Sequence, residues 1–253
     1  MKKIYILAVV AALLLVAIIF LLNMVTVRPI IPSESLKEIN LPSGFVITVF
    51  ADLGSGELSI PGPNPGPRMM LVKEEVLFVS VPNQGKIIAL EDKNNDKKAD
   101  NATVFIEGLN NPHGIDFSDG WFYIAEEDKV IRVKDENNDL KADADSIQKL
   151  TDLPSGAGHF TRTVRVKGDL MYISAGSSCN VCIENDSMRA SIQKCNIDGS
   201  NCSVYAKGLR NAVGMALQPG TDKLFATDNG RDWLGDDLPP DEINLIEEGK
   251  NYG

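Results

Sequence analysis

The chain has 253 residues, of which 43% are hydrophobic, and its formal net charge is −10. This length allows one large domain or two small ones, and the composition is sufficient for a sizeable core. No run of Lys or Arg is long enough to follow a phosphate backbone, so the composition excludes nucleic acid as a partner.

The first 27 residues differ from the rest of the chain. Met1, Lys2 and Lys3 form a short positive end, and residues 4–27 are almost purely apolar. This stretch is long enough to span a bilayer, and no clear cleavage site follows it. We therefore predict an uncleaved signal anchor with a cytoplasmic N-terminus, in the cell membrane. A long cleaved signal peptide is the alternative; both interpretations place the body outside the cytoplasm.

Residues 28–40 contain two prolines and several polar residues, which is typical of a linker. We expect the folded domain to extend from residue 41 to residue 253. Residues 41–51 predict a turn followed by a strand, and residues 54–67 predict a loop because glycine and proline are dense there. An extended segment is expected at 68–72.

A repeat begins after this loop. One apolar strand pattern recurs at 76–80, 121–125, 170–174 and 223–227, with spacings of 45, 49 and 53 residues. A polar turn precedes each copy, and second short strands are expected at 86–90, 130–133 and 192–196. A period of about 40–50 residues with several strands per period is typical of β-propeller blades. A β-sandwich with accidental spacing is the alternative.

A second repeat lies between the predicted blades. Asp and Asn alternate in two segments that are offset by 43 residues, and Ca²⁺ favours such hard oxygen ligands. Each segment predicts either a calcium loop or a pair of solvated Asn/Asp turns. The candidate ligands are Asp92, Asn94, Asp96 and Asp100 in the first loop, and Asp135, Asn137, Asp139 and Asp143 in the second.

The chain has only two histidines, and each stands just before a predicted strand. His159 follows Gly156 and Gly158, which allow a sharp turn, and a strand is expected at 161–166. A histidine held in this way suits a general base because its pKa lies near neutrality. A loop histidine that only bonds its neighbours is the alternative. For His113, we favour a structural role.

Four cysteines lie within 24 residues, at positions 179, 182, 195 and 202. Outside the cell they are expected to be oxidised, and four cysteines allow three pairings. A predicted hairpin turn lies between Cys195 and Cys202, so we favour the two local bonds. A four-thiolate zinc site and a redox C-x-x-C motif are the alternatives.

The polar segments 208–214 and 226–244 are dense in charged and turn-forming residues. Arg210 and Asn211 form a fork of donors that suits an oxyanion or a carboxylate. The second segment is rich in aspartate and suits a cation, although a solvated acidic loop explains the same composition.

Four motifs resemble the glucose/sorbosone dehydrogenase family, in particular its sorbosone dehydrogenase-like branch. They are GHFTRTV from residue 158, GSSCN from 176, GLRNAVG from 208 and DNGRDWLGDDLPPDEIN from 228. The resemblance covers about residues 41–253. It implies a six-bladed β-propeller that uses pyrroloquinoline quinone, and calcium loops similar to those between the predicted blades.

The resemblance also implies roles for individual residues. His159 matches the general base, and Arg210 and Asn211 match residues at the quinone. Asn229, Gly230 and Arg231 match a loop that covers the cofactor and lends carbonyls to its calcium, with Asp241 nearby. Gly158 stands where the family often has aspartate. Because only four phased strands are found, we expect a C-terminally incomplete propeller of four to five blades, with further cofactor-binding basic residues beyond residue 253.

Together these observations predict a membrane-anchored, extracytoplasmic oxidoreductase. It would oxidise a sugar or a sugar-derived aldehyde, pass hydride to pyrroloquinoline quinone with help from His159, and need Ca²⁺ and an electron acceptor of unknown identity. Two alternatives remain at this point: a non-catalytic propeller that binds a ligand or protein outside the cell, and a calcium-dependent hydrolase of lactonase type.

Overall fold

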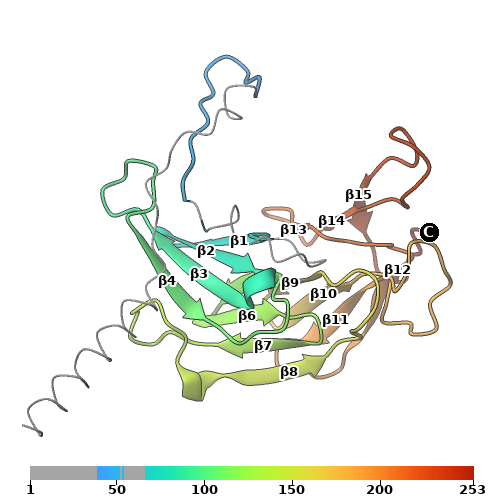
Figure 1. Ribbon diagram of the computed structural model, residues 1–253. Helices are drawn as coiled ribbons and strands as arrows, with labels where there is room; N and C mark the ends of the chain where they lie inside the picture. Colours follow the sequence, from blue (N-terminus) through green and yellow to red (C-terminus); the bar gives the residue numbers. More distant parts are fainter. Residues whose placement is uncertain (1–38, 52, 54–65) are drawn as a thin grey trace, which may run out of the picture.

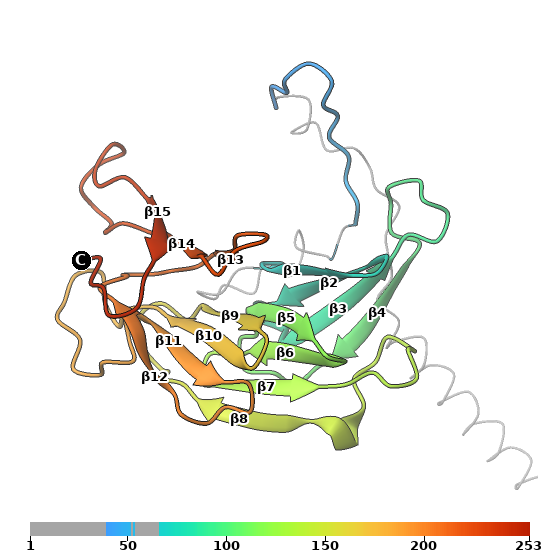
Figure 2. The same cartoon turned by 180° about the vertical axis from the view of Figure 1, so that it is seen from behind.

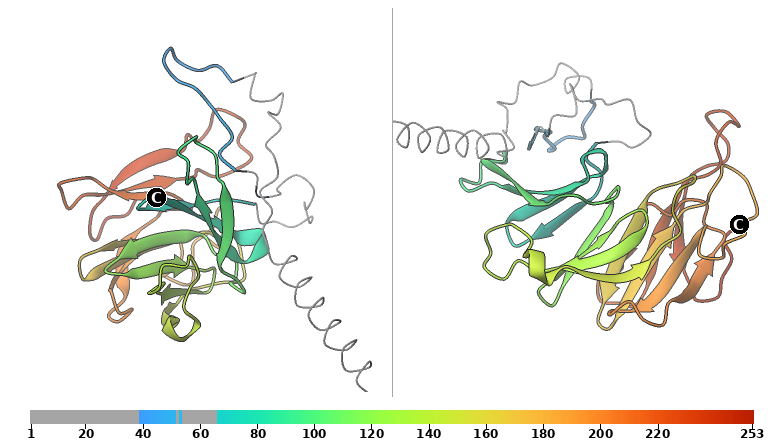
Figure 3. Two further views of the ribbon diagram at one scale, coloured as in Figure 1. Left: turned by 90° about the vertical axis from the view of Figure 1, so that its left-hand side faces the viewer. Right: turned by 60° about the horizontal axis from the view of Figure 1, so that its bottom comes forward.

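The computed structural model describes residues 39–51, 53 and 66–253, and within them the chain is all-β. Four antiparallel sheets stand side by side in a propeller-like arc (Figures 1 and 2). Two further views show the sheets fanned around a common axis (Figure 3). The first strands of neighbouring sheets lie against one another and are the innermost. The four sheets agree with the four to five blades that the sequence predicts for this chain.

Each sheet is built in chain order from neighbouring strands. The first contains β1 (Met70–Lys73), β2 (Val76–Val81), β3 (Lys86–Glu91) and β4 (Asn101–Ile106). The second contains β5 (Gly114–Ser118), β6 (Trp121–Ala125), β7 (Lys129–Val133) and β8 (Gln148–Asp152). The third contains β9 (Arg162–Lys167), β10 (Leu170–Ala175), β11 (Ser191–Asn196) and β12 (Ser203–Lys207). The fourth contains β13 (Met215–Leu217), β14 (Leu224–Asp228) and β15 (Glu242–Ile246).

Two short 3-10 turns complete the regular structure, η2 (Pro82–Gln84) and η3 (Ala144–Ser146). The central apolar strands coincide with the predicted repeats to within one residue at each end, because each alternates between the two faces of a buried sheet. The extended segment predicted at 68–72 and the strand predicted at 161–166 correspond to β1 and β9.

Apolar side chains fill the space between neighbouring sheets. Phe78 and Phe105 of the first sheet meet Phe122 of the second, with ring centroids 4.6–5.1 Å apart. Met171 and Ile173 of the third sheet pack against the second, and Ile192 packs toward the fourth. The two middle sheets therefore bury both of their faces against neighbouring sheets, which is the packing expected for propeller blades.

The innermost strands are tied to one another along the axis. A Cβ atom at Gly114 of β5 would stand 2.6 Å from the Val164 nitrogen of β9, so only glycine fits this close approach. The Arg165 side chain donates to the carbonyls of Ile115 and Met215, in β5 and β13. The Asp116 carboxylate accepts from the Val166 backbone. Three adjacent sheets are thereby held at fixed angles.

One strand predicted from the sequence is wrong. Residues 45–51 have no strand partner, and the side chains of Phe45 and Val46 are exposed. The expected turn is present, because the Phe45 N–H donates to the Pro42 carbonyl. Beyond it, the Phe50 carbonyl accepts one bond from Ala99. An alternating apolar pattern becomes a strand only when a neighbouring strand can accept its hydrogen bonds.

Three other predictions fall largely outside the described residues. They are the anchor at 1–27, most of the linker at 28–40 and most of the loop at 54–67. Within residues 39–51, 53 and 66–253, no helix is long and apolar enough to cross a bilayer. The predicted membrane anchor therefore stays a prediction.

The cysteines form the two local disulfides that the sequence favours. Cys179 is bonded to Cys182, and Cys195 is bonded to Cys202. The second bond joins the end of β11 to the start of β12, where the intervening turn brings the two residues together. The first closes a loop at the end of β10. The four-thiolate zinc alternative is therefore wrong.

His113 is fully buried beside the innermost strands, in agreement with a structural role. Its Nδ1 lies 3.2 Å from the Arg162 carbonyl, which can only accept, so Nδ1 carries the proton. Burial lowers the pKa of His113 to about 4, and the positive charge of Arg68 contributes to the lowering. The imidazole is therefore neutral at physiological pH.

This buried neutral histidine makes stability dependent on pH. The unfolded chain binds a proton at His113 below about pH 6.5, whereas the folded protein binds it only near pH 4. The contribution of His113 to stability is therefore complete above about pH 6.5 and is lost as the pH falls toward 4. We expect the stability advantage of the wild type over His113→Asn to shrink over this range by up to about 3 kcal/mol.

Urea denaturation at pH 7.5, 6.0 and 4.5 measures this difference. The substitution keeps a donor near the Arg162 carbonyl but removes the titrating group. An advantage of the wild type that is the same at all three pH values would contradict the prediction.

Candidate functional site

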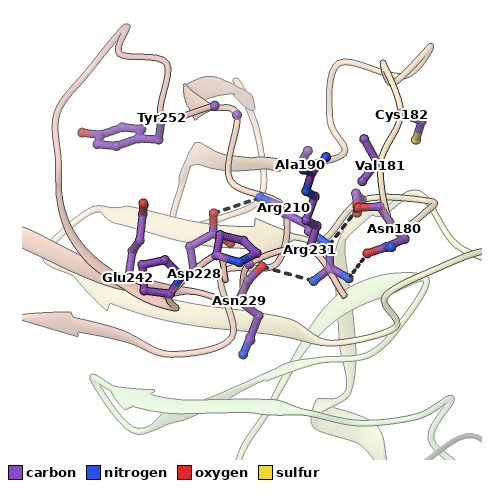
Figure 4. A pocket seen from close by; sticks show the side chains of 16 residues that line it. Asn180, Val181, Cys182, Ala190, Arg210, Asp228, Asn229, Arg231, Glu242 and Tyr252 are labelled. Atoms are coloured by element: carbon purple, nitrogen blue, oxygen red, sulfur yellow. Dashed lines mark hydrogen bonds between the residues drawn. The ribbon is translucent and has the colours of Figure 1, made fainter. Parts of the chain in front are cut away.

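The candidate site lies at one end of the sheets. In an antiparallel sheet, the residues before the first strand and after the second lie at the same end. This end therefore holds His159, Ser177, Arg210 and Asp228. A cleft of about 490 Å³ opens here, and Figure 4 shows its wall formed by the loop after β10, the segment before β13 and the loop after β14.

Arg210 is the centre of the cleft wall. Its guanidinium donates to the Asn180 carbonyl at 2.9 Å, to the Asn180 side chain at 2.8 Å and to the Asn229 carbonyl at 3.1 Å (Figure 4). It also forms an ion pair with Asp232 at 2.7 Å. The predicted donor fork is therefore already engaged by the protein, because two loops have folded onto it. In this structure Arg210 builds the wall and contributes positive charge.

A buried carboxylate holds the Arg210–Asn211 backbone. Asp228 accepts the N–H of Arg210 at 3.0 Å and the N–H of Asn211 at 2.6 Å. Burial raises the pKa of Asp228, and the two amide donors oppose this effect. The end of β14 thus determines where the segment before β13 runs.

His159 is held in one tautomer. Its Nδ1 lies 3.0 Å from the Ser177 carbonyl and 3.0 Å from the Ser177 hydroxyl, which itself donates to the Cys179 carbonyl. Both neighbours therefore act as acceptors, so Nδ1 carries the proton and Nε2 is the basic nitrogen. Burial lowers the pKa of His159, and the charge of Arg210 contributes. The half-buried imidazole is thus neutral and basic at Nε2.

His159 and Asn211 meet above Gly176. A Cβ atom at Gly176 would stand 2.6 Å from His159 Cβ and 2.8 Å from Asn211 Oδ1. The Thr161 hydroxyl donates to the same Asn211 oxygen at 3.0 Å, which orients the amide. The structure thus brings together two residues that are 52 positions apart in the sequence.

The loop after β14 folds back on itself beside the cleft. Asp241 accepts the Gly230 N–H at 2.9 Å and the Asn229 side-chain N–H at 3.2 Å. The carbonyl oxygens of Pro239 and Pro240 lie 3.2 and 3.3 Å from the position that a Cβ would occupy on Gly230. Oxygen atoms therefore gather around Gly230, where the sequence predicts a calcium-bound loop. The Arg231 side chain lines the cleft and is exposed.

The two predicted calcium loops lie away from this cleft and repeat each other's geometry. Asp92 accepts from the amides of Asp96 and Lys97, and Asp135 accepts from those of Asp139 and Leu140. Asp100 and Asp143 accept amides near the start of their loops. These bonds make each segment an ordered Asx turn. Calcium binding by Asp92, Asn94, Asp96, Asp100, Asp135, Asn137, Asp139 and Asp143 stays a prediction.

One group of three ligating side chains is found among the described residues. Cys179, Cys182 and Glu184 bring a ligand atom each to within 4.8 Å of one another. The two sulfurs are joined in a disulfide, so they are not thiolate ligands in this state.

Sequence reasoning missed Asn180, Asp228 and Asp232 as parts of the site. Asn180 lies between the two cysteines of the C-x-x-C loop, so the disulfide shapes the segment that captures Arg210. Asp228 and Asp232 flank the predicted residues Asn229 to Arg231 directly. Their roles depend on contacts across 17–52 positions in the chain, which spacing alone does not indicate.

Solved structures with a similar fold include sugar dehydrogenases. The PQQ domain of pyranose dehydrogenase from Coprinopsis cinerea, in its holo form, has a TM-score of 0.62 at 20% identity and matches 74% of this chain and 52% of its own. The PQQ-bound aldose sugar dehydrogenase from Streptomyces coelicolor has a TM-score of 0.56 at 21% identity and matches 76% and 63%. At these identities the likeness shows the fold alone. This chain therefore spans between half and two thirds of those chains.

Relatives by sequence carry no assigned activity. An uncharacterized protein of Borreliella burgdorferi is 31% identical over an alignment of 155 residues that covers 57% of this chain and 41% of the relative. The uncharacterized protein slr1608 of Synechocystis is 44% identical over 50 residues, or 20% and 11% of the two chains. The chain thus spans less than half the length of these curated relatives. The family model of a domain of unknown function, DUF7133, matches residues 66–244, which is more than half of the chain. This protein therefore belongs to the DUF7133 family.

Proposed function

We propose that this protein is an oxidoreductase that oxidises a sugar or sugar-derived aldehyde outside the cytoplasm, with pyrroloquinoline quinone and Ca²⁺ bound at the cleft. The fold, which resembles that of PQQ sugar dehydrogenases, supports the proposal. The observation that carries it is His159, a neutral imidazole whose Nδ1 is committed to Ser177, which lines the cleft together with Arg210.

The residues at the cleft suit an anionic planar cofactor. The volume of about 490 Å³ lies within the usual range of small-molecule sites, which is about 300–1,000 Å³. Arg231 offers an exposed guanidinium at the cleft, and Arg210 adds a fixed positive charge within the cleft wall. Asn229 supplies an amide group. When bound, the quinone would supply a two-electron acceptor for the hydride of the substrate.

The oxygens around Gly230 suit a calcium ion that accompanies the cofactor. Ca²⁺ takes hard oxygen ligands, including backbone carbonyls and carboxylates. Here the carbonyls of Pro239 and Pro240 and the carboxylate of Asp241 gather beside Gly230. The backbone of Gly230 and Arg231 is the part that we expect to bind the ion.

The chain's own contribution to the reaction is proton transfer and positioning. Nε2 of His159 would accept the proton of a sugar hydroxyl, while Nδ1 donates to the Ser177 carbonyl and holds the ring still. Burial lowers the pKa of His159, and the positive charge of Arg210 contributes because it disfavours a second cation nearby. Asp228 holds the backbone of Arg210 and Asn211 in place.

A titration tests the proposed function directly. The full chain in detergent would be titrated with pyrroloquinoline quinone, with and without Ca²⁺, and binding would be measured by calorimetry. Dye reduction would then be followed with a panel of aldoses and sorbosone. We expect calcium-dependent binding and turnover with at least one sugar. A folded protein that binds no cofactor under either condition would overturn the proposal.

Replacement of the proposed base should remove turnover while leaving binding intact. His159→Gln should lower kcat by about 10²–10⁴-fold, the usual contribution of a general base, with little change in cofactor affinity. Because burial lowers the pKa of His159, wild-type kcat/KM should fall on the acid side only below pH 6.5. That acid limb should be absent in His159→Gln. Wild-type rates in the variant would remove His159 from the mechanism.

Asp228 should act on cofactor affinity through the backbone that it holds. Asp228→Asn replaces one of the two carboxylate acceptors by an amide donor, so one of the N–H groups of Arg210 and Asn211 loses its partner. A hydrogen bond to a charged acceptor contributes about 1.5–3 kcal/mol. We expect cofactor affinity to fall about tenfold or more, as measured by calorimetry. Asp222→Asn, on an exposed turn far from the cleft, is the control and should bind as the wild type does.

A further inference from the structure

We propose that the mouth of the cleft docks on a lipid surface. The contact surface is an apolar rim made of Val181, Ile183, Trp233, Leu234 and Leu238. These side chains come from the loop after β10 and the loop after β14, both of which contribute residues to the cleft wall. The inference concerns where the cleft opens and does not depend on the proposed reaction.

The rim exposes large apolar side chains to solvent. Trp233 is 89% exposed and Ile183 is 97% exposed, and Val181, Leu234 and Leu238 are also exposed. Single exposed apolar residues are normal, but a group on adjoining loops indicates an interaction surface. Tryptophan is enriched at membrane interfaces because its ring is apolar and its N–H is polar.

The two loops of the rim are fixed to each other. The Asn180 side chain accepts the Asp232 N–H at 2.8 Å and donates to the Asp232 carbonyl at 3.2 Å. The Arg210 side chain also donates to the side chains of Asn180 and Asp232. The disulfide between Cys179 and Cys182 closes the loop after β10. The apolar side chains are therefore presented on a rigid mount.

The backbone at Trp233 supports a functional interpretation of its exposure. Its φ is 73°, in the left-handed region that bulky residues rarely adopt. Such strain usually persists at functional sites, where the surroundings impose it. The neighbouring Asp232 is held by Asn180 and Arg210, so these contacts impose the turn that raises Trp233 into solvent.

The path of the chain favours a lipid surface as the occupant. Residues 39–51, which include the exposed Phe45 and Val46, project from the same side of the molecule as the loop after β14 (Figures 1 and 2). Residues 28–38 connect this segment to the predicted membrane anchor. The intervening residues 28–38 can reach at most about 40 Å. With the anchor in a bilayer, the rim would therefore face a nearby membrane surface.

The charge at the tip of the loop after β14 indicates which lipid headgroups the rim can contact. Asp236 and Asp237 lie between Leu234 and Leu238 and are exposed. Two carboxylates at the surface would be repelled by anionic lipid headgroups, and salt would screen this repulsion. The rim therefore suits a zwitterionic surface such as phosphatidylcholine and contacts it through apolar and indole groups.

Quenching of Trp233 fluorescence by lipid tests the proposal. The full chain carrying Trp121→Phe, which leaves Trp233 as its single tryptophan, would be reconstituted into phosphatidylcholine vesicles. We expect the emission maximum of Trp233 to lie at a shorter wavelength in the vesicles than in detergent-free solution that contains little lipid. Lipids brominated near the headgroup should quench this emission. Added phosphatidylglycerol should reduce the quenching at low salt, and Asp236→Asn with Asp237→Asn should restore it.

Matched variants show whether the rim makes the contact. Leu234→Ser with Leu238→Ser should reduce the quenching, whereas Ile147→Ser, at an exposed apolar site beside β8, should not. Trp233→Phe leaves Trp121, which is covered by Arg132 at 4.4 Å and Lys134 at 4.8 Å and should not be quenched. Trp233 that stays open to aqueous iodide would overturn the proposal. So would shielding from iodide without quenching by brominated lipid, which would indicate a protein contact.

Discussion

The close packing of β5 against β9 determines the rest of this structure. The two innermost strands approach so closely at Gly114 that a methyl group would meet the backbone of the next sheet. The partly buried side chains of Arg165 and Asp116 then fix β5, β9 and β13 to one another. Because these strands start at one end of the sheets, the loops that precede them converge there. The site is thus a consequence of how the sheets meet along the axis.

At that end of the sheets, the polar groups mostly form hydrogen bonds with other groups of the protein. The Arg210 guanidinium donates to Asn180, Asn229 and Asp232, and the Asp228 carboxylate accepts from two backbone amides. Such a wall is rigid, since loosening one loop would leave a charge without its partner in a half-buried place. Rigidity of this kind suits a site that must orient a planar ligand and a base. For this reason the proposed function assigns the direct contacts with a ligand to His159 Nε2 and Arg231 rather than to Arg210.

The sequence predicts the strands well and the site only in part. Residues 121–125 alternate between two buried faces, so local pattern and final structure agree at β6. Residues 45–51 have a similar pattern but lack a partner strand, and pattern alone cannot indicate that. The resemblance to a known family singles out His159, Arg210 and Asn211, which do come together. It gives no indication of Asn180. This residue accepts a hydrogen bond from Arg210, 30 positions away in the sequence, and the bond depends on the fold of a loop closed by a disulfide.

The same loops give the cleft two different surfaces. Facing the cleft are polar groups, among them Asn229, Arg231 and Glu242. Facing solvent are Trp233, Leu234 and Leu238, which the fold leaves exposed although burial would stabilise them. One network of hydrogen bonds, centred on Arg210, holds both surfaces in place. A contact made on the outer surface would therefore act on the same residues that shape the inner one, because Asp232 bonds to Arg210 and adjoins both Arg231 and Trp233.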